Sequence, residues 1–267
     1  MVVWGVKIMS PQDTGTKFEN YLVNLFNNKK FSELNNQGQY VIKNIFDKYD
    51  DNAVFESGLV RGFMKPDIYI KHGDKTVHIS VKTGTARTVH QERISTFIPF
   101  LRRLGISNRT LQTILFMHFS DGTMDGTGEK RYSFEDMRYH LKDRIIEANR
   151  ELNSRIEIVQ AFIEHCMFVG VITNAIPADY IYHGEENFGY LVSKEDFIKY
   201  IKRKNWSYLS NLHIGPVYFR CHARYLNKPI LSEKSRLMVD VWFPNLITHV
   251  RNASVYASTR NKKMETR

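Results

Sequence analysis

The sequence predicts a mixed α/β (α+β) fold, in which helices flank a mixed central sheet and a basic, β-rich part follows toward the C-terminus. Three observations support this: amphipathic helical patterns near the N-terminus, strand-like alternation over residues 66–82, and positive charge gathered in the last quarter of the chain. The 267 residues are 42% hydrophobic. That composition is enough to bury a sizeable core, in one large domain or in one domain with an appended lobe.

The first part of the chain predicts an alternation of helices and strands. The apolar side chains of residues 16–28 recur at helical spacing, and those of 66–82 alternate as in strands. In order, the expected elements are helices over 16–28 and 39–49, strands over 53–61, 66–71 and 76–82, a helix over 89–104 bent by Pro99, and a strand over 111–119.

The second part predicts more helix, then strand. Residues 120–130 are rich in Gly and Asp without calcium-binding EF-hand spacing, and we expect a linker or flexible loop there. The elements expected after it are helices over 133–152 and 154–168, a hairpin of 178–183 and 188–192, a short helix capped by Ser193 and Asp196, and strands over 217–223 and 237–243. We expect residues 1–120 to form the core, and 121–267 to form a helical and β-rich part packed with it as one unit.

Positive charge is concentrated near the C-terminus. Residues 199–267 contain 14 Lys/Arg and 3 Asp/Glu, whereas the whole chain has a net charge of +10. A basic segment beside a near-neutral body favours a polyanionic partner such as nucleic acid, because phosphate contacts release counterions. A solvated basic face is the alternative.

Other features limit the functional class. The two cysteines, Cys166 and Cys221, fit neither a disulfide framework nor a zinc site, and indicate a reducing, cytoplasmic location. We also expect no membrane association, because no apolar run approaches the ~20 residues that a membrane span needs.

The hairpin over 66–82 places chemistry-bearing side chains together. With residues 72–75 as its four-residue turn, Asp67 lies opposite Ser80, and the side chains of Asp67, Ser80 and Lys82 share the polar face. A carboxylate can bind a hard cation such as Mg²⁺ through oxygen, and a lysine ammonium can balance charge on a phosphate. This pattern predicts phosphodiester hydrolysis, with a second acid expected nearby.

Pro66-Asp67, followed after twelve residues by Ser80-Val81-Lys82, resembles the active-site motif of the PD-(D/E)XK nuclease superfamily. The expected element order through residue 119 also resembles that family's core, so the similarity covers roughly the first 120 residues. The resemblance implies a restriction-endonuclease-like core and a Mg²⁺-dependent endonuclease.

One position departs from the family pattern, because Ser80 stands where the second acid is usual. A subset of type II restriction endonucleases has Ser-x-Lys here and takes the acid from the following helix, which in this sequence implies Glu92. The resemblance therefore implies Asp67, Glu92 and Lys82 as the catalytic group, with Asp67 and Glu92 as metal ligands and Ser80 assisting through a water. Many family members also have a glutamate on the first helix, here Glu19.

Each site residue also has a structural interpretation. Asp67 could pair with Lys65, Glu92 could favour the first turn of a helix, and Lys82 could extend its stem along a sheet edge. Thr16 and Glu19 fit a capping box equally well. We expect His78 and His90 to be hydrogen-bonded neighbours of the site.

The basic C-terminal segment is the expected DNA-reading part, because arginine reads guanine and lysine holds phosphate. The candidate contacts are Arg220, His222, Arg224, Lys234, Arg236 and Arg251. The leading hypothesis is a type II-like restriction enzyme that cuts double-stranded DNA at a short sequence as a homodimer or larger even oligomer. The alternatives are a repair or junction nuclease of the same superfamily and a non-catalytic DNA-binding module.

Overall fold

The computed structural model describes residues 11–62, 64–84, 87–129, 131–186, 188–204, 206, 211–221 and 236–265. The chain divides into two compact units, each built from separate stretches of sequence. Unit 1 comprises Met1–Ala86, Asn174–Phe197 and Ile247–Arg267, and unit 2 comprises Arg87–Thr173 and Ile198–Leu246. The expected boundary after residue 120 therefore falls inside unit 2. Helices and two sheets confirm the α+β class.

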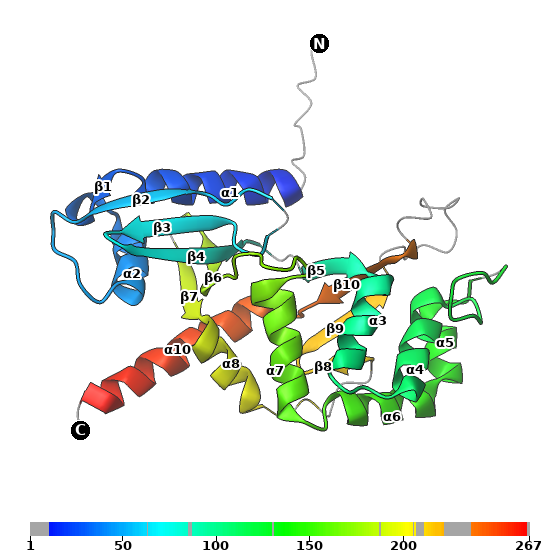
Figure 1. The fold of residues 1–267 in the computed structure, drawn as a ribbon. Coiled ribbons are helices and arrows are strands. Elements are labelled where there is room, and N and C mark those ends of the chain that lie inside the picture. Colours follow the sequence, from blue (N-terminus) through cyan, green and yellow to red (C-terminus); the bar gives the residue numbers. More distant parts are fainter. Residues whose placement is uncertain are drawn as a thin grey trace, which may run out of the picture. The chain divides into compact units, whose positions relative to one another are not determined.

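Unit 1 is built on a six-stranded mixed sheet (Figure 1). Its strand order is β1 (Lys29–Lys30), β2 (Val54–Leu59), β3 (Ile68–His72), β4 (Lys75–Lys82), β6 (Tyr180–Glu185) and β7 (Phe188–Ser193). Neighbouring strands are antiparallel except β4 and β6, which are parallel. The strand parallel to β4 thus comes from the second half of the chain, beyond the predicted core.

The hairpin of β3 and β4 has the predicted register. Tyr69 pairs with His78 and Lys71 with Thr76. Because His72 also pairs with Lys75, the turn contains only residues 73–74 and not the expected 72–75, and Gly73 in it takes a positive φ of 57°. Alternation places five β-branched residues on one face. These are Ile68, Ile70, Val77, Ile79 and Val81, all at most 6% exposed.

Two helices cover that apolar face. Helix α1 (Pro11–Phe26) contributes Phe18, Leu22 and Phe26 at spacings of four residues, and α2 (Asn36–Ile45) contributes further apolar residues to the same core. In Figure 1, α1 lies along β2 and β3. The last helix of unit 1, α10 (Leu246–Glu265), joins α2 through a 3.1 Å hydrogen bond between Tyr40 and Ser254. The other face of the hairpin carries the polar side chains of Asp67, Ser80 and Lys82.

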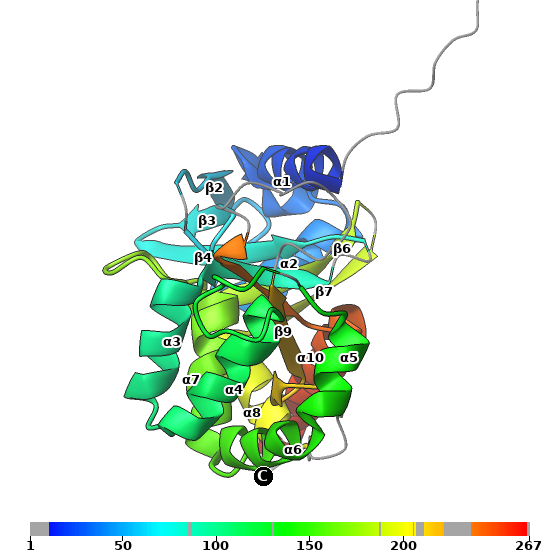
Figure 2. The same ribbon diagram turned by 90° about the vertical axis from the view of Figure 1, so that its right-hand side faces the viewer.

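Unit 2 is built on a four-stranded antiparallel sheet. Its order is β5 (Thr88–Arg93), β10 (Met238–Trp242), β9 (Val217–Cys221) and β8 (His213–Ile214). Helices α3 (Ile94–Arg103), α4 (Asn108–Phe119) and α7 (Ile156–Glu164) pack beside it (Figure 2), with Phe97 and Phe162 in edge-to-face contact. The unit also contains α5 (Phe134–His140), α6 (Lys142–Leu152) and a π-helical turn, His165–Val169, while α8 (Lys194–Lys202) crosses the boundary between the units.

Several predicted elements differ from the structure. The expected strand over 111–119 is helix α4, and the expected helix over 89–104 is strand β5 followed by α3. The helix expected over 133–152 is two helices, and the supposedly strand-like remainder ends in the 20-residue helix α10. Within the described residues, no helix combines the length and apolar composition that crossing a bilayer requires.

Candidate active site

The polar face of the β3–β4 hairpin brings Asp67, Ser80 and Lys82 together. The Val81 amide donates to Asp67 Oδ2 at 2.6 Å, and the Ser80 hydroxyl donates to the same oxygen at 3.3 Å. Lys82 Nζ lies 3.5 Å from Asp67 Oδ2, and donates to Ser80 Oγ at 2.8 Å and to the Val81 carbonyl at 3.0 Å. The carboxylate and the ammonium are therefore both held in place by the strand that carries Lys82.

The site is reachable from solvent. The side chains of Asp67 and Lys82 are 26% and 25% exposed, whereas Ser80 is fully buried between them. A backbone hydrogen bond of 2.9 Å from the Asp67 amide to the Ile79 carbonyl extends the hairpin ladder to Asp67. The end of the strand thus presents an acid and a lysine to solvent, and the buried serine is hydrogen-bonded to both.

The charges of this site also act on Glu19. It lies on α1, and its pKa is raised first by burial and then by the negative charge of Asp67, while Lys82 acts in the opposite direction. The charges of Asp67 and Lys82 thus both act on the carboxylate of Glu19. Helix α1 begins at Pro11, so Thr16 lies inside it and the capping-box interpretation of Thr16 and Glu19 is wrong.

His183 is a neighbour that the sequence did not indicate. It lies on β6 directly across from Lys82, so their side chains share the polar face of the sheet. Burial and the positive charge of Lys82 lower the pKa of His183 to about 4. The two residues are about a hundred positions apart in the sequence, and the parallel pairing of β4 with β6 makes them neighbours. The imidazole is consequently neutral at physiological pH.

Glu92 occupies a different environment from the one expected. It lies on strand β5 and not at the start of a helix, so the premise that placed it as a helix-borne acid is wrong. Its carboxylate is buried in unit 2, 3.1 Å from His165 Nε2 and 3.6 Å from His90 Nε2. His90 is thus a neighbour of Glu92.

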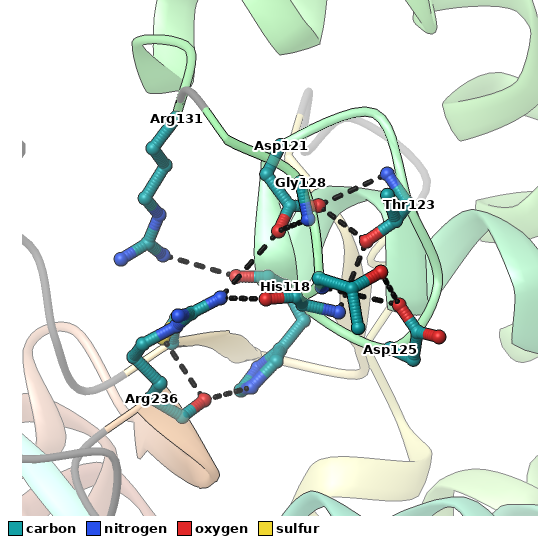
Figure 3. A network of polar contacts seen from close by, with 10 residues as sticks. His118, Asp121, Thr123, Asp125, Gly128, Arg131 and Arg236 are labelled. Atoms are coloured by element: carbon teal, nitrogen blue, oxygen red, sulfur yellow. Dashed lines mark hydrogen bonds and ion pairs between the residues drawn. The ribbon is translucent and has the colours of Figure 1, made fainter.

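Arg236, one of the expected DNA contacts, holds a loop of unit 2 (Figure 3). Its guanidinium donates to the Gly126 carbonyl and lies 3.5 Å from the buried carboxylate of Asp121. Asp121 also accepts from the Gly128 amide at 3.1 Å, and the Arg236 carbonyl contacts His118. The loop over 120–129, expected to be a linker or a flexible loop, is thus held by a hydrogen bond and an ion pair to Arg236, just before β10.

The remaining expected DNA contacts differ in position. Arg220 lies on β9 with its guanidinium against the ring of Trp242, and Arg251 lies on α10 above the ring of Tyr190 at 6.0 Å. His222, Arg224 and Lys234 lie outside the described residues.

The arrangement in unit 1 combines two carboxylates, an ammonium and a buried hydroxyl. Two close acids attract a divalent cation, since oxygen ligands are those that magnesium prefers. An adjacent ammonium can stabilise negative charge that develops on a phosphate. No protein-family model matches the chain, and a search of curated proteins likewise finds no match.

Proposed function

We propose that this protein is a magnesium-dependent endonuclease that hydrolyses phosphodiester bonds of double-stranded DNA at the polar end of the β3–β4 hairpin. The observation that carries the proposal is the pairing of Asp67 with Lys82 at that end, 3.5 Å apart, with their charges also acting on Glu19. Hydrolysis of a phosphodiester requires both an activated water and compensation of negative charge. Carboxylates and an ammonium on a rigid strand end can meet both requirements.

The donor set fits a magnesium ion. Burial and the charge of Asp67 both raise the pKa of Glu19, so two negative groups repel each other where a dication would offset that repulsion. Glu19 and Asp67 are the residues that would hold it, both through oxygen. Glu19 takes the role that the resemblance implied for Glu92.

Magnesium, when bound, polarises the phosphate and lowers the pKa of a coordinated water. Asp67 is kept in position by the Val81 amide, so its orientation needs no adjustment when DNA arrives. Lys82 donates to two oxygen acceptors, Ser80 Oγ and the Val81 carbonyl, and its ammonium lies 3.5 Å from Asp67 Oδ2. We assign Lys82 the stabilisation of negative charge on the phosphate.

The charge distribution supports DNA as the substrate. The excess of Lys and Arg after residue 199 offers a polyanion a long-range attraction that is strongest at low salt. We extend the proposal to cleavage at a short specific sequence by a homodimer, because symmetric cutting of a duplex requires paired active sites.

The test is digestion of supercoiled plasmid DNA by the full chain with and without magnesium, read on a gel. We expect discrete bands from the wild type, and none from Asp67→Asn or Lys82→Ala. The matched controls are Glu56→Gln and Lys71→Ala, which remove an ion pair of the same 3.5 Å separation on the same sheet. These controls should cleave as the wild type does.

Two outcomes would overturn the proposal. One is cleavage by Asp67→Asn at the wild-type rate, with circular dichroism showing that the variant is folded. The other is mobility-shift binding of DNA by the wild type without magnesium-dependent cleavage. That second result would favour a non-catalytic DNA-binding module. Smeared products in place of discrete bands would keep the nuclease but remove the sequence specificity.

A further inference from the structure

Three side chains with metal-binding atoms meet inside unit 2. His90 and Glu92 are two residues apart on β5, so both point to the same face of the sheet. His165 begins the π-helical turn that follows α7 and packs against β5. One ligand atom of each residue lies within 4.8 Å of those of the others. Residues more than 70 positions apart are thus brought to one point.

The separations fit a shared ion. For metal–ligand bonds of about 2.0–2.2 Å, two ligand atoms of a tetrahedral site lie roughly 3.3–3.6 Å apart. Glu92 Oε1 lies 3.1 Å from His165 Nε2 and 3.6 Å from His90 Nε2. Little movement of the side chains is therefore needed to place the same carboxylate oxygen and the two imidazole nitrogens around a cation.

The three side chains are shielded from solvent and fixed by their neighbours. The side chains of His90, Glu92 and His165 are 4%, 1% and 11% exposed. The Phe100 ring stacks on His165 with centroids 4.0 Å apart, which fixes the plane of the imidazole. Thr96 Oγ1 lies 2.8 Å from the Arg93 carbonyl and 3.2 Å from the second carboxylate oxygen of Glu92, and its one proton is shared between these acceptors. Such outer contacts are what orient metal ligands in proteins.

We propose that His90, Glu92 and His165 form a binding site for a transition metal ion of the zinc class, linking β5 to the end of α7. Two imidazoles and one carboxylate suit zinc and its neighbours, whereas magnesium prefers oxygen ligands alone. Three protein ligands leave one tetrahedral position for a water or a small ligand. The site is separate in chemistry from the proposed nuclease centre and does not depend on it.

The test measures metal content and not DNA cleavage. The full chain is stripped with a chelator and dialysed against Zn²⁺ in an excess of Mg²⁺, and bound zinc is measured by elemental analysis. We expect one zinc per chain, and a rise in melting temperature with zinc. Glu92→Gln and His165→Gln should each weaken zinc binding by at least about 100-fold, since even the partners of metal ligands contribute 10- to 100-fold.

Asp240→Asn is the matched control. Asp240 is a buried acid of the same sheet that pairs with Gln91, so its side chain lies on the face opposite to that of Glu92. This variant should bind zinc as the wild type does. Failure of zinc to bind, or equal binding by Glu92→Gln, would overturn the site.

A measurement on the wild type covers the case in which the variants do not fold. In ¹⁵N spectra of the histidine side chains, zinc should shift the signals of His90 and His165 and leave those of buried His213 in place. Cobalt substitution should give the visible absorption of a four-coordinate ion with nitrogen and oxygen ligands. Unchanged histidine signals on saturation with zinc would overturn the proposal.

Discussion

The two acid-containing clusters, Glu19–Asp67–Lys82 in unit 1 and His90–Glu92–His165 in unit 2, show how neighbours decide what a glutamate can do. Burial raises the pKa of both glutamates. For Glu19 the negative charge of Asp67 adds to that effect, and its pKa is raised. For Glu92 the hydrogen bonds from His165 and His90 outweigh burial, and its pKa falls to about 2.

The difference predicts different ligands. Repelling carboxylates near solvent attract a hard dication, which reduces their repulsion. A buried carboxylate already paired with two imidazoles offers a mixed nitrogen and oxygen site, which borderline metals prefer. The same residue type therefore serves two chemistries within one chain, and the clusters can be separated by choosing the metal.

The largest expected effect is that a variant of each cluster loses the function of that cluster and keeps the function of the other. Asp67→Asn should lower magnesium-dependent cleavage by at least about 100-fold, since it loses a metal ligand, and it should leave zinc uptake unchanged. Glu92→Gln should do the reverse. Cleavage rates and zinc content of the same preparations give the comparison. Loss of cleavage in Glu92→Gln with normal zinc content would instead assign Glu92 to the nuclease centre.

The next effect concerns stability and pH in the metal-free protein. Glu92 changes from its ordinary pKa of 4.5 to about 2 on folding. The unfolded chain therefore binds the proton more readily, so the stabilisation is complete above about pH 5 and is lost as the pH falls toward 2. The shift corresponds to roughly 3 kcal/mol.

Urea unfolding of the wild type and Glu92→Gln, both with a chelator, measures this contribution. The difference in unfolding free energy should be largest at neutral pH and should shrink toward about pH 3. The buried His118, whose pKa is lowered to about 4, is present in both proteins, so its effect cancels. His90 and His165 lose their acid partner in the variant, so the difference reports the three side chains together. A difference that does not change with pH would contradict the assigned ionisation of Glu92.

The sequence predicted the hairpin because its signals are local. Alternation over Ile68–His72 and Lys75–Lys82, with a glycine in the turn, defines both the register and the polar face. The juxtaposition of Asp67, Ser80 and Lys82 followed from that register alone. Such arguments succeed where the partner strand is the next one along the chain.

The errors arose where the partner is distant. Strand β5 pairs with β10, and Glu92 lies opposite Val239, so nothing nearby distinguishes it from the start of helix α3. Helix α4 is a short apolar run whose periodicity fits either structure. Its N-terminal cap, Ser107, which accepts from the Thr110 amide, was the available signal.

One residue of the sites remained hidden for the same reason, whereas helix α10 was missed for a different one. His165 meets Glu92 only after α7 and β5 have packed, and no motif joins residues so far apart. Helix α10 did have a readable signal, since Leu246, Val250 and Ala253 are buried at spacings of four and three. Its many polar residues concealed that pattern.

A smaller effect is expected from Ser80→Ala. The hydroxyl donates to Asp67 and accepts from Lys82, so its loss removes support from both without removing a charge. A hydrogen bond to a charged group is worth about 1.5 kcal/mol or more, which corresponds to a roughly tenfold lower cleavage rate. Ser57→Ala removes another buried hydroxyl of unit 1, bonded to the Val23 carbonyl, and should leave the rate unchanged. Complete loss of cleavage in Ser80→Ala would make the serine a direct participant.

The smallest effect distinguishes repulsion from metal binding at Glu19. In the absence of metal, Glu19→Gln should stabilise the protein slightly, by about 0.5 kcal/mol or less, because it removes a half-buried charge beside Asp67. With magnesium the order should reverse, since the wild type gains stability from the bound ion and the variant gains less. Thermal unfolding with and without magnesium measures both signs. Glu33→Gln is the control, because Glu33 is another acid of unit 1, in the short 3-10 helix Phe31–Glu33, and accepts from the Lys30 amide at 3.0 Å. If magnesium raised the melting temperature of Glu19→Gln as much as that of the wild type, Glu19 would be a neighbour of Asp67 and not a ligand.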